Sequence, residues 1–187
     1  GTYQIAMVTD VGQLKDGSFN EFTWNGCKKY ASDNGLSYKY YQPANGNAAT
    51  DDDRIKALTD ACEAGAEVVV TPGFLQETAL KAVVPNYPEV QFVFIDGWDM
   101  GYPNLVGVSY KEEQAGYLAG YAAVKDGFTK LGFMGGMSVP AVQAFGYGYL
   151  QGADAAAKEL GVNVEATYHY TGNFDESDAN KATAKTM

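Results

Sequence analysis

The chain has 187 residues, an apolar content of 46% and a charged content of 19%, which is typical of a globular protein with a sizeable core. Its formal net charge of -10 argues against nucleic-acid binding, because phosphate recognition depends on clustered Lys and Arg. No apolar run approaches the length of a membrane-spanning helix. Cys27 and Cys62 are expected to be small buried hydrophobic residues, and nothing in the composition calls for a metal or a cofactor.

Strand and helix patterns alternate over residues 1–125. A continuous apolar run at 5–8 predicts a strand buried on both faces, and a polar loop follows it. Ser18 and Glu21 have the spacing of a capping box, which predicts a helix that begins at Phe19 and stops at Gly35. The remaining expected elements are strands at 36–41, 67–71, 90–95 and 105–109 and helices at 51–62, 75–84 and 112–124. This order predicts right-handed crossovers and a doubly wound parallel sheet.

The alternation of strand and helix patterns is interrupted at Asp126 and Gly127 and then begins again. Beyond them we expect strands at 130–134 and 162–170 and helices at 140–160 and from 177 onward. Two strands and an unfinished helix are too little for an independent core, so the chain is expected to be a fragment of a longer protein. We therefore predict one α/β domain over 1–125 and the truncated start of a second over 126–187. One continuous sheet of seven strands is the alternative.

Carboxylates, glycines and aromatic residues follow several of the expected strands. The residues concerned are Asp10, Gly73, Phe74, Asp96 and Met137, with Asn20 and Trp24 on the first helix. Because the carboxyl ends of parallel strands meet at one edge of a sheet, we expect the residues of one sheet to lie close together. Such an edge suits a small polyhydroxylated or aromatic ligand, since carboxylates accept hydrogen bonds from sugar hydroxyls and aromatic rings stack on flat faces.

These residues also have purely structural interpretations. Asp10 and Asp96 could be ordinary turn residues, and Trp24 could belong to the core. The dinucleotide-binding, phosphate-binding and nucleophile-elbow motifs are all missing from the sequence, which favours binding without catalysis.

The segment 8–10 (Val-Thr-Asp), followed by 16–21 (Asp-Gly-Ser-Phe-Asn-Glu), resembles the opening of the basic membrane protein family. That family comprises type I substrate-binding proteins of ABC transporters, including purine nucleoside receptor lipoproteins. Further similar segments lie at 73–74, 95–97, 114–120 and 132–137, so the resemblance covers nearly the whole chain. It implies a type I periplasmic-binding-protein-like fold of two doubly wound parallel-sheet domains that close on a nucleoside, with purine nucleosides favoured, in an interdomain cleft.

In such proteins aromatic side chains from the two domains sandwich the base, and carboxylates hold the ribose. The matching positions are Asp10 and Asn20 for polar recognition, Trp24 and Phe74 beside Gly73 for the first-domain wall, Asp96 for the hydroxyls, and Met137 and Phe145 from the second domain. The resemblance further implies an ABC permease as membrane partner and an extracytoplasmic location, either periplasmic or on a lipid anchor, in a bacterium. A ligand-sensing regulatory protein of the same fold is the alternative function, followed by an α/β enzyme acting on nucleosides or sugars.

Family members continue beyond the part that this chain matches, which places further strands of the second domain outside it. We therefore expect weak or no nucleoside binding by the 187-residue chain alone and strong binding by the intact protein. Sheet edges exposed by truncation could pair between chains, so a dimer or a domain swap is one expected outcome.

Overall fold

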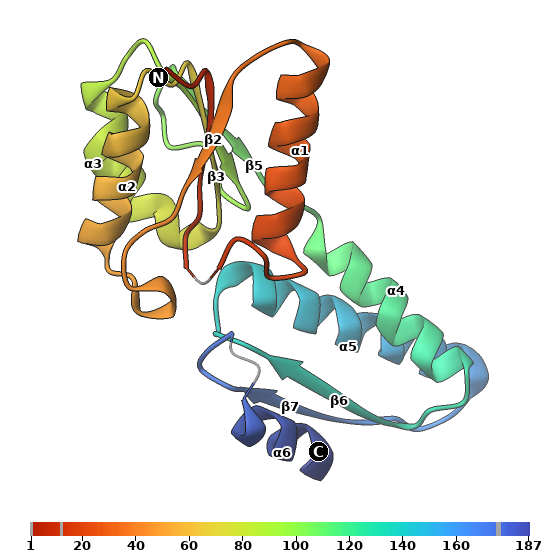
Figure 1. The fold of residues 1–187 in the computed structure, drawn as a ribbon. Helices are drawn as coiled ribbons and strands as arrows, with labels where there is room; N and C mark the ends of the chain where they lie inside the picture. Colours follow the sequence, from red (N-terminus) through yellow and green to blue (C-terminus); the bar gives the residue numbers. More distant parts are fainter. Residues whose placement is uncertain (1, 12, 175–176) are drawn as a thin grey trace. The chain divides into compact units, whose positions relative to one another are not determined.

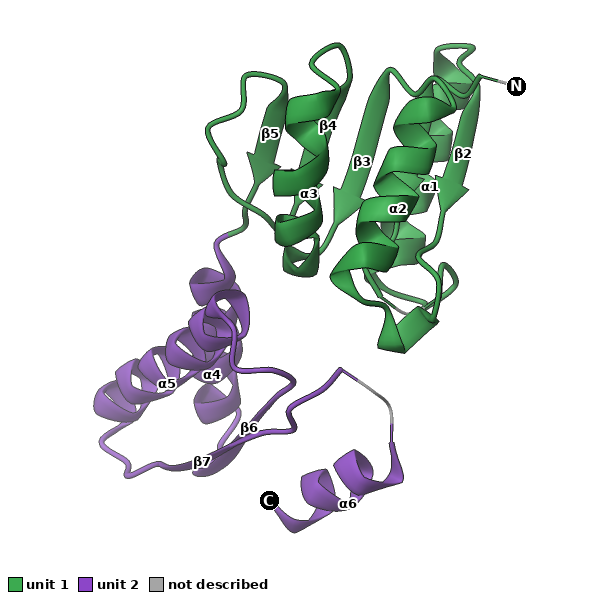
Figure 2. Cartoon of the chain, turned by 90° about the vertical axis from the view of Figure 1, so that its left-hand side faces the viewer, with its two compact units in different colours: residues 1–110 green, residues 111–187 purple. Residues whose placement is uncertain are grey.

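The computed structural model describes residues 2–11, 13–174 and 177–187, and the chain divides into two compact units, 1–110 and 111–187 (Figure 2). The boundary predicted at 125/126 differs from this division by one helix, α4 (Glu112–Lys125). This helix belongs to the second unit because it packs closely against α5 (Pro140–Leu160).

The first unit is built on a five-stranded sheet with the strand order β2-β1-β3-β4-β5, in which every pair is parallel. Its strands are β1 (Ile5–Val8), β2 (Tyr38–Tyr41), β3 (Val68–Pro72), β4 (Gln91–Ile95) and β5 (Leu105–Val108). The parallel α/β architecture expected from the sequence is confirmed. The alternative of one seven-stranded sheet is wrong, because the last two strands of the chain form a separate sheet.

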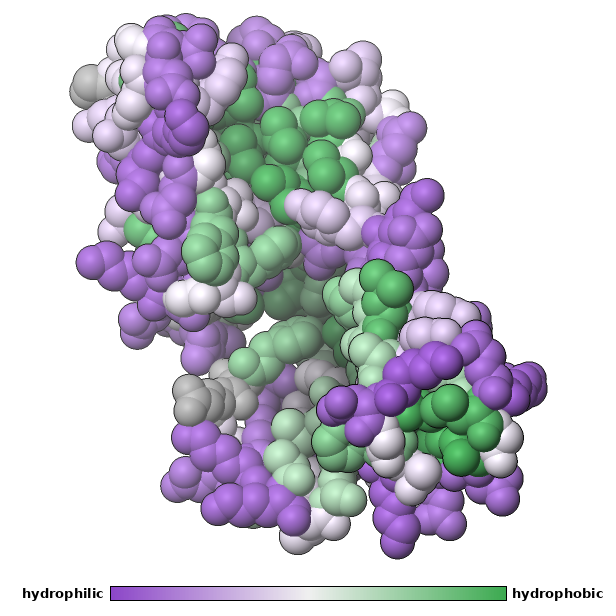
Figure 3. Space-filling view, turned by 90° about the vertical axis from the view of Figure 1, so that its right-hand side faces the viewer, coloured by the Kyte–Doolittle hydropathy of each residue, from purple (hydrophilic) through white to green (hydrophobic). Residues whose placement is uncertain are grey.

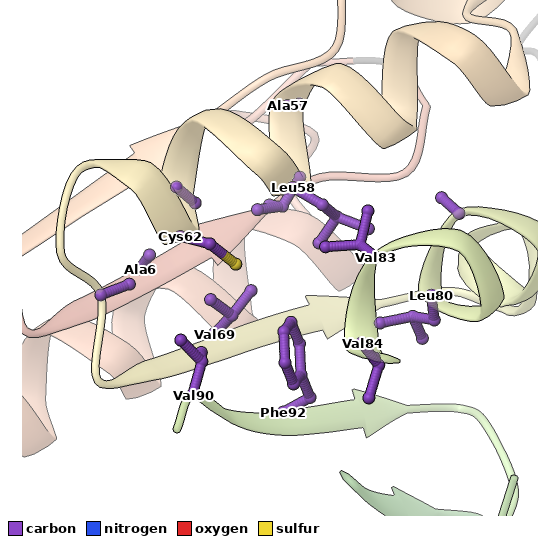
Figure 4. Packing of buried hydrophobic residues seen from close by; sticks show 14 of the residues in the cluster. Ala6, Ala57, Leu58, Cys62, Val69, Leu80, Val83, Val84, Val90 and Phe92 are labelled. Carbon is purple, nitrogen blue, oxygen red and sulfur yellow. The ribbon is translucent and has the colours of Figure 1, made fainter. Parts of the chain in front are cut away.

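Helices α2 (Asp51–Glu63) and α3 (Glu77–Val83) cover one face of this sheet, and α1 (Phe19–Asp33) lies on the other (Figure 1). Figure 4 shows the core beneath α2 and α3, where Leu58 and Leu80 point toward Val69 and Phe92 of the sheet. All four side chains are at most 1% exposed. A capping box opens α2: the Thr50 side chain accepts from the Asp53 amide, and the Asp53 side chain accepts from the Thr50 amide.

The α1 face is covered less completely. Met7, Cys27 and Ala31 are buried where α1 packs on β1. Beside them lies an apolar hollow of about 770 Å³, lined by α1 and by the sheet, for example by Phe22, Val70 and Val93 (Figure 3). Cys27 and Cys62 are both buried and unpaired, as predicted for small hydrophobic residues, and desolvation raises the pKa of the two thiols to about 11 and about 12.

The second unit contains a parallel pair of strands, β6 (Lys130–Gly135) and β7 (Glu165–Tyr170). Helices α4 and α5 lie side by side on one face of this pair, and α6 (Asp178–Thr186) lies on the other (Figure 1). Glycines allow α4 and α5 to approach closely: a Cβ atom on Gly120 would overlap the Tyr149 carbonyl, and one on Gly152 would overlap the Tyr117 carbonyl. Across the described ranges, no helix combines the length and the apolarity needed to span a membrane.

Candidate functional site

The carboxyl edge of the first sheet brings together three of the predicted site residues. Asp10 follows β1, Gly73 follows β3 and Asp96 follows β4, and these three strands are neighbours in the sheet. The amide of Gly73 donates to the carbonyl oxygen of Ile95 at 2.9 Å, which joins the ends of β3 and β4 directly. The parallel topology therefore places these residues as the sequence predicted.

Asp10 has a buried carboxylate with specific neighbours. The side chain is 8% exposed, and Oδ1 accepts from the Val11 amide at 2.7 Å. Gly73, at φ 98°, lies directly against it, and a Cβ atom at position 73 would overlap Oδ2 of Asp10. The glycine therefore provides both the backbone conformation and the space that this carboxylate needs.

Burial raises the pKa of Asp10 to about 6, in spite of the Val11 hydrogen bond and the nearby Arg54 charge, which lower it. A carboxylate that is this strongly desolvated has few competing water contacts. It can therefore form a strong hydrogen bond to a ligand hydroxyl or N–H group.

Asn20 lies in the first turn of α1 and is 5% exposed. Its Nδ2 donates to the Val11 carbonyl at 3.1 Å, and its Oδ1 has no hydrogen-bond partner among the residues that the structure describes. Buried polar atoms are almost always paired in native proteins, and Asn20 Oδ1 shares its unpaired state with Thr9 Oγ1 and Gln76 Oε1 near the end of β1.

The start of α1 is capped by Asp16, and the predicted capping box of Ser18 and Glu21 is wrong. Ser18 makes no side-chain cap bond. Asp16 instead accepts from the amides of Ser18 (2.9 Å), Asn20 (3.0 Å) and Glu21 (3.1 Å). Desolvation works to raise the pKa of Asp16, but these amide hydrogen bonds outweigh it and lower the pKa. Asp16 thereby fixes the backbone that carries Asn20.

Two buried polar residues that sequence reasoning missed hold the end of β1. Gln76 Nε2 donates to the carbonyl oxygens of Val8 (3.2 Å) and Thr9 (2.9 Å), and Thr71 Oγ1 donates to Val8 (3.2 Å). Gln76 and Thr71 are both completely buried. The available signal was the presence of polar residues at positions that the pattern assigns to a buried strand and the helix after it.

Asp96 and Phe74 complete the first-unit edge. Asp96 is half-buried and adopts φ 59°, a left-handed conformation that residues other than glycine seldom adopt. Backbone strain of this kind concentrates at functional sites. Phe74 is half-buried and opens the short 3-10 helix Phe74–Gln76 that follows β3.

Trp24 is placed in a packing role. Its ring makes edge-to-face contacts with Tyr38 (5.6 Å between centroids) and Tyr40 (5.5 Å) of β2, and Lys28 Nζ lies 5.9 Å from its centroid. The structure therefore does not bring Trp24 together with the edge residues, because its ring is directed at the strand and not at the start of the helix.

In the second unit, Met137 is half-buried just after β6, and Phe145 is 41% exposed in the second turn of α5. Sequence reasoning missed Phe174, which follows β7 and is 56% exposed. The Gly172 amide donates to the Gly136 carbonyl at 3.0 Å, and a Cβ atom on Gly136 would overlap the Phe174 ring. An aromatic residue a few positions beyond a parallel strand was the signal that could have identified it.

No group of three or more His, Cys, Asp or Glu side chains in the described part of the chain could hold a metal ion. The polar side chains at the first-unit edge are two carboxylates and one amide. They can accept from hydroxyl and N–H groups and, through the amide, donate to an oxygen or a ring nitrogen.

Comparison with known proteins yields consistent similarities. A family model described as "ABC transporter substrate-binding protein PnrA-like" matches residues 3–187. The chain is 30% identical to the ABC transporter nucleoside-binding protein BmpA of Lactococcus lactis, over 98% of this chain and 51% of that protein. It is 31% identical to basic membrane protein A2 of Borrelia garinii, over 100% of this chain and 53% of that protein.

Among solved structures, the chain is similar to an ABC transporter solute-binding protein from Aeropyrum pernix, with a TM-score of 0.84 and 26% identity. The alignment covers 99% of this chain and 52% of that one. The chain thus spans about half the length of the relatives that it matches.

Proposed function

The chain belongs to the PnrA-like family of ABC transporter substrate-binding proteins, and we propose that it carries part of the site where such a protein binds a purine nucleoside. Proteins of this family bind a substrate for transport and are not enzymes. The α/β enzyme considered from the sequence is therefore set aside. The fold is that of solute-binding proteins, as the resemblance implied.

The observation that carries the nucleoside proposal is the set of polar atoms at the first-unit edge. Asn20 Oδ1 is buried without a partner among the described residues, and the Asp10 carboxylate lies in the same loop region with its pKa raised by burial. A ligand that donates N–H or O–H groups would satisfy these acceptors, and a nucleoside has such donors on its ribose and, for most bases, on its ring.

Each remaining edge residue has a role in this proposal. Asp96 accepts from ribose hydroxyls, and Phe74 provides an apolar surface for the base. Gly73 keeps space for the Asp10 carboxylate. The choice of ligand class is supported by the Lactococcus lactis relative, which is called a nucleoside-binding protein.

For the whole protein, the proposal includes delivery of the nucleoside to an ABC permease. Substrate-binding proteins of this family are extracytoplasmic, and a lipid anchor remains a prediction. The participation of Met137, Phe145 and Phe174 in binding is likewise a prediction, as is dimerisation of the chain.

A thermal-shift panel tests the ligand class. The protein expressed from the whole reading frame that encodes this chain would be heated with adenosine, guanosine, inosine, uridine, ribose or glucose. Trp24 and Trp98, the two tryptophans of this chain, both lie in the first unit and report on its unfolding by fluorescence. A ligand present at one hundred times its Kd stabilises the folded state by about 2.7 kcal/mol. We expect purine nucleosides to raise Tm and glucose to leave it unchanged; the reverse pattern would refute the proposal.

A further inference from the structure

We propose that Arg54 is a positioning residue for ligand binding, which ties the end of β1 to the loop before α2 and places a positive charge beside Asp10. The inference deepens the proposed nucleoside site and rests on it for its binding readout. The sequence pattern gives no sign of this role.

The contacts of Arg54 span two segments that are far apart in the sequence. Nη1 donates to the carbonyl oxygen of Asp10 at 3.3 Å and to that of Ala49 at 3.1 Å, and Nη2 donates to Asp51 Oδ1 at 2.8 Å. The arginine is 6% exposed, so its contact with Asp10 is shielded from water. One guanidinium group thus fixes the backbone of the residue whose carboxylate faces the proposed ligand.

The position of this arginine is unfavourable by itself. Arg54 lies at the start of α2, where the helix dipole repels positive charge, and burial adds a desolvation cost. The ion pair with Asp51 compensates only in part, because the Asp51 side chain is 49% exposed to solvent. Burial of an arginine at a helix N-terminus is electrostatically unfavourable. The two backbone carbonyl oxygens that Arg54 contacts indicate that its role is to hold these segments in place.

Arg54 is the charged side chain that lowers the pKa of Asp10, and its effect comes after those of the backbone amides that donate to the carboxylate. From α1 the neutral amide of Asn20 faces the carboxylate, and from the β3 end Gly73 does. From α2 the charged groups are Arg54 and its partner Asp51. Loss of the guanidinium would therefore favour the protonated form of Asp10, which would then donate a hydrogen bond where a ligand hydroxyl needs an acceptor.

The first test needs no ligand. The pKa of Asp10 would be measured by carbon-13 NMR of its side-chain carboxyl in wild type, Arg54→Met, Arg54→Lys and Lys56→Met. Lys56 is the matched control, since it lies on the same helix with its side chain 74% exposed and pairs with Asp60. We expect Arg54→Met to raise the pKa by about one unit, Arg54→Lys to raise it by less, and Lys56→Met to leave it unchanged.

An unchanged Asp10 pKa in Arg54→Met would overturn the inference. If that variant does not fold, Arg54→Gln is measured instead: it removes the charge but keeps a hydrogen-bond donor, so the same Asp10 pKa as wild type would overturn the inference as well. Because no nucleoside is involved, this result is independent of whether the proposed ligand is right.

The second test measures adenosine affinity against pH in the protein that contains this chain. We expect Arg54→Met to weaken binding severalfold more at pH 6 than at pH 9, because Asp10 would be largely protonated in the variant at pH 6 and is ionised in both proteins at pH 9. A loss that is the same at every pH would mean that Arg54 is only structural and would contradict the inference. No adenosine binding by wild type would count against the proposed function and leave the NMR result standing.

Discussion

Gly73 and Asp10 fit against each other so closely that a Cβ atom on the glycine would overlap the carboxylate oxygen Oδ2. The two residues follow neighbouring parallel strands, β3 and β1. Their contact sets the position of the buried acceptor in the proposed site.

Gly73→Ala should therefore disturb both stability and binding. The φ of 98° is strained for alanine, and the added methyl group must displace the Asp10 carboxylate. We expect a loss of about 2–4 kcal/mol in the free energy of unfolding, measured by urea titration with tryptophan fluorescence. Gly101→Ala is the matched control, because Gly101 also has a positive φ, of 77°, but open space around its Cβ position. Equal losses in the two variants would show that the contact with Asp10 has no energetic weight.

Asp10→Asn should change how stability depends on pH. Burial raises the folded-state pKa of Asp10 to about 6, above the value of 3.8 for an unperturbed carboxyl. The folded state therefore holds this proton more tightly, a contribution that is fully present below pH 3.8 and lost as pH rises through about 6. The rise in the Asp10 pKa therefore corresponds to a stability contribution of about 3 kcal/mol, at roughly 1.4 kcal/mol per pKa unit.

The measurement compares urea unfolding of wild type and Asp10→Asn between pH 3.5 and 7.5. We expect wild type to lose stability relative to the variant as pH rises across this window, while other titrating groups cancel in the difference. Parallel curves would show that Asp10 is not desolvated in the folded protein.

Asp16→Ala removes the acceptor that caps α1. Three amide hydrogen bonds end on this carboxylate, so the free energy of unfolding should fall by about 1–2 kcal/mol. Ser18→Ala is the control, since Ser18 makes no cap bond, and it should change stability by less than about 0.5 kcal/mol. A larger effect for Ser18→Ala than for Asp16→Ala would restore the capping box that the sequence predicted.

The helix pair of the second unit offers a separate test. Gly120→Ala should cost about 2 kcal/mol or more, because its Cβ would overlap the Tyr149 carbonyl and push α4 from α5. Gly26→Ala, at an exposed position of α1 that lines the apolar hollow and has nothing within 4 Å of its Cβ position, should gain up to about 1 kcal/mol from helix propensity. Thermal melts followed by far-ultraviolet circular dichroism distinguish the expected loss of stability in Gly120→Ala from the expected gain in Gly26→Ala.

How far the sequence predicted the structure depended on whether local pattern or tertiary contact decided the outcome. The buried strands and the helix stops at Gly35 and Gly161 follow from local rules, and the structure places them as expected. The edge positions of Asp10, Gly73 and Asp96 follow from the parallel topology. For these positions, the rule that the carboxyl ends of parallel strands meet at one edge of a sheet was sufficient.

The domain boundary and the cap of α1 depended on contacts that local pattern does not contain. Helix α4 belongs to the second unit because Gly116 and Gly120 fit against α5, and the related segments 116–120 and 148–152 (Gly-Tyr-Leu-Ala-Gly and Gly-Tyr-Leu-Gln-Gly) were a visible but unused signal. Asp16 and Ser18 were both suitable caps by type, and only the loop geometry selects Asp16. The polar type of Gln76 was a signal of a buried hydrogen bond, but neither Gln76 nor Arg54 has a sequence signature that identifies its partners, which are backbone carbonyls distant in the chain.

The most direct test of the central claim is calorimetric titration of adenosine, guanosine and inosine into the protein expressed from the whole reading frame, in wild type, Asn20→Ala and Asp52→Asn. Asn20 Oδ1 is a buried acceptor without a hydrogen-bond partner among the described residues, whereas Asp52 is exposed in the first turn of α2. The account predicts submicromolar binding of at least one nucleoside, weakened about tenfold or more by Asn20→Ala and unchanged by Asp52→Asn. Absence of heat with all three nucleosides, or tight binding that Asn20→Ala leaves intact, would contradict it.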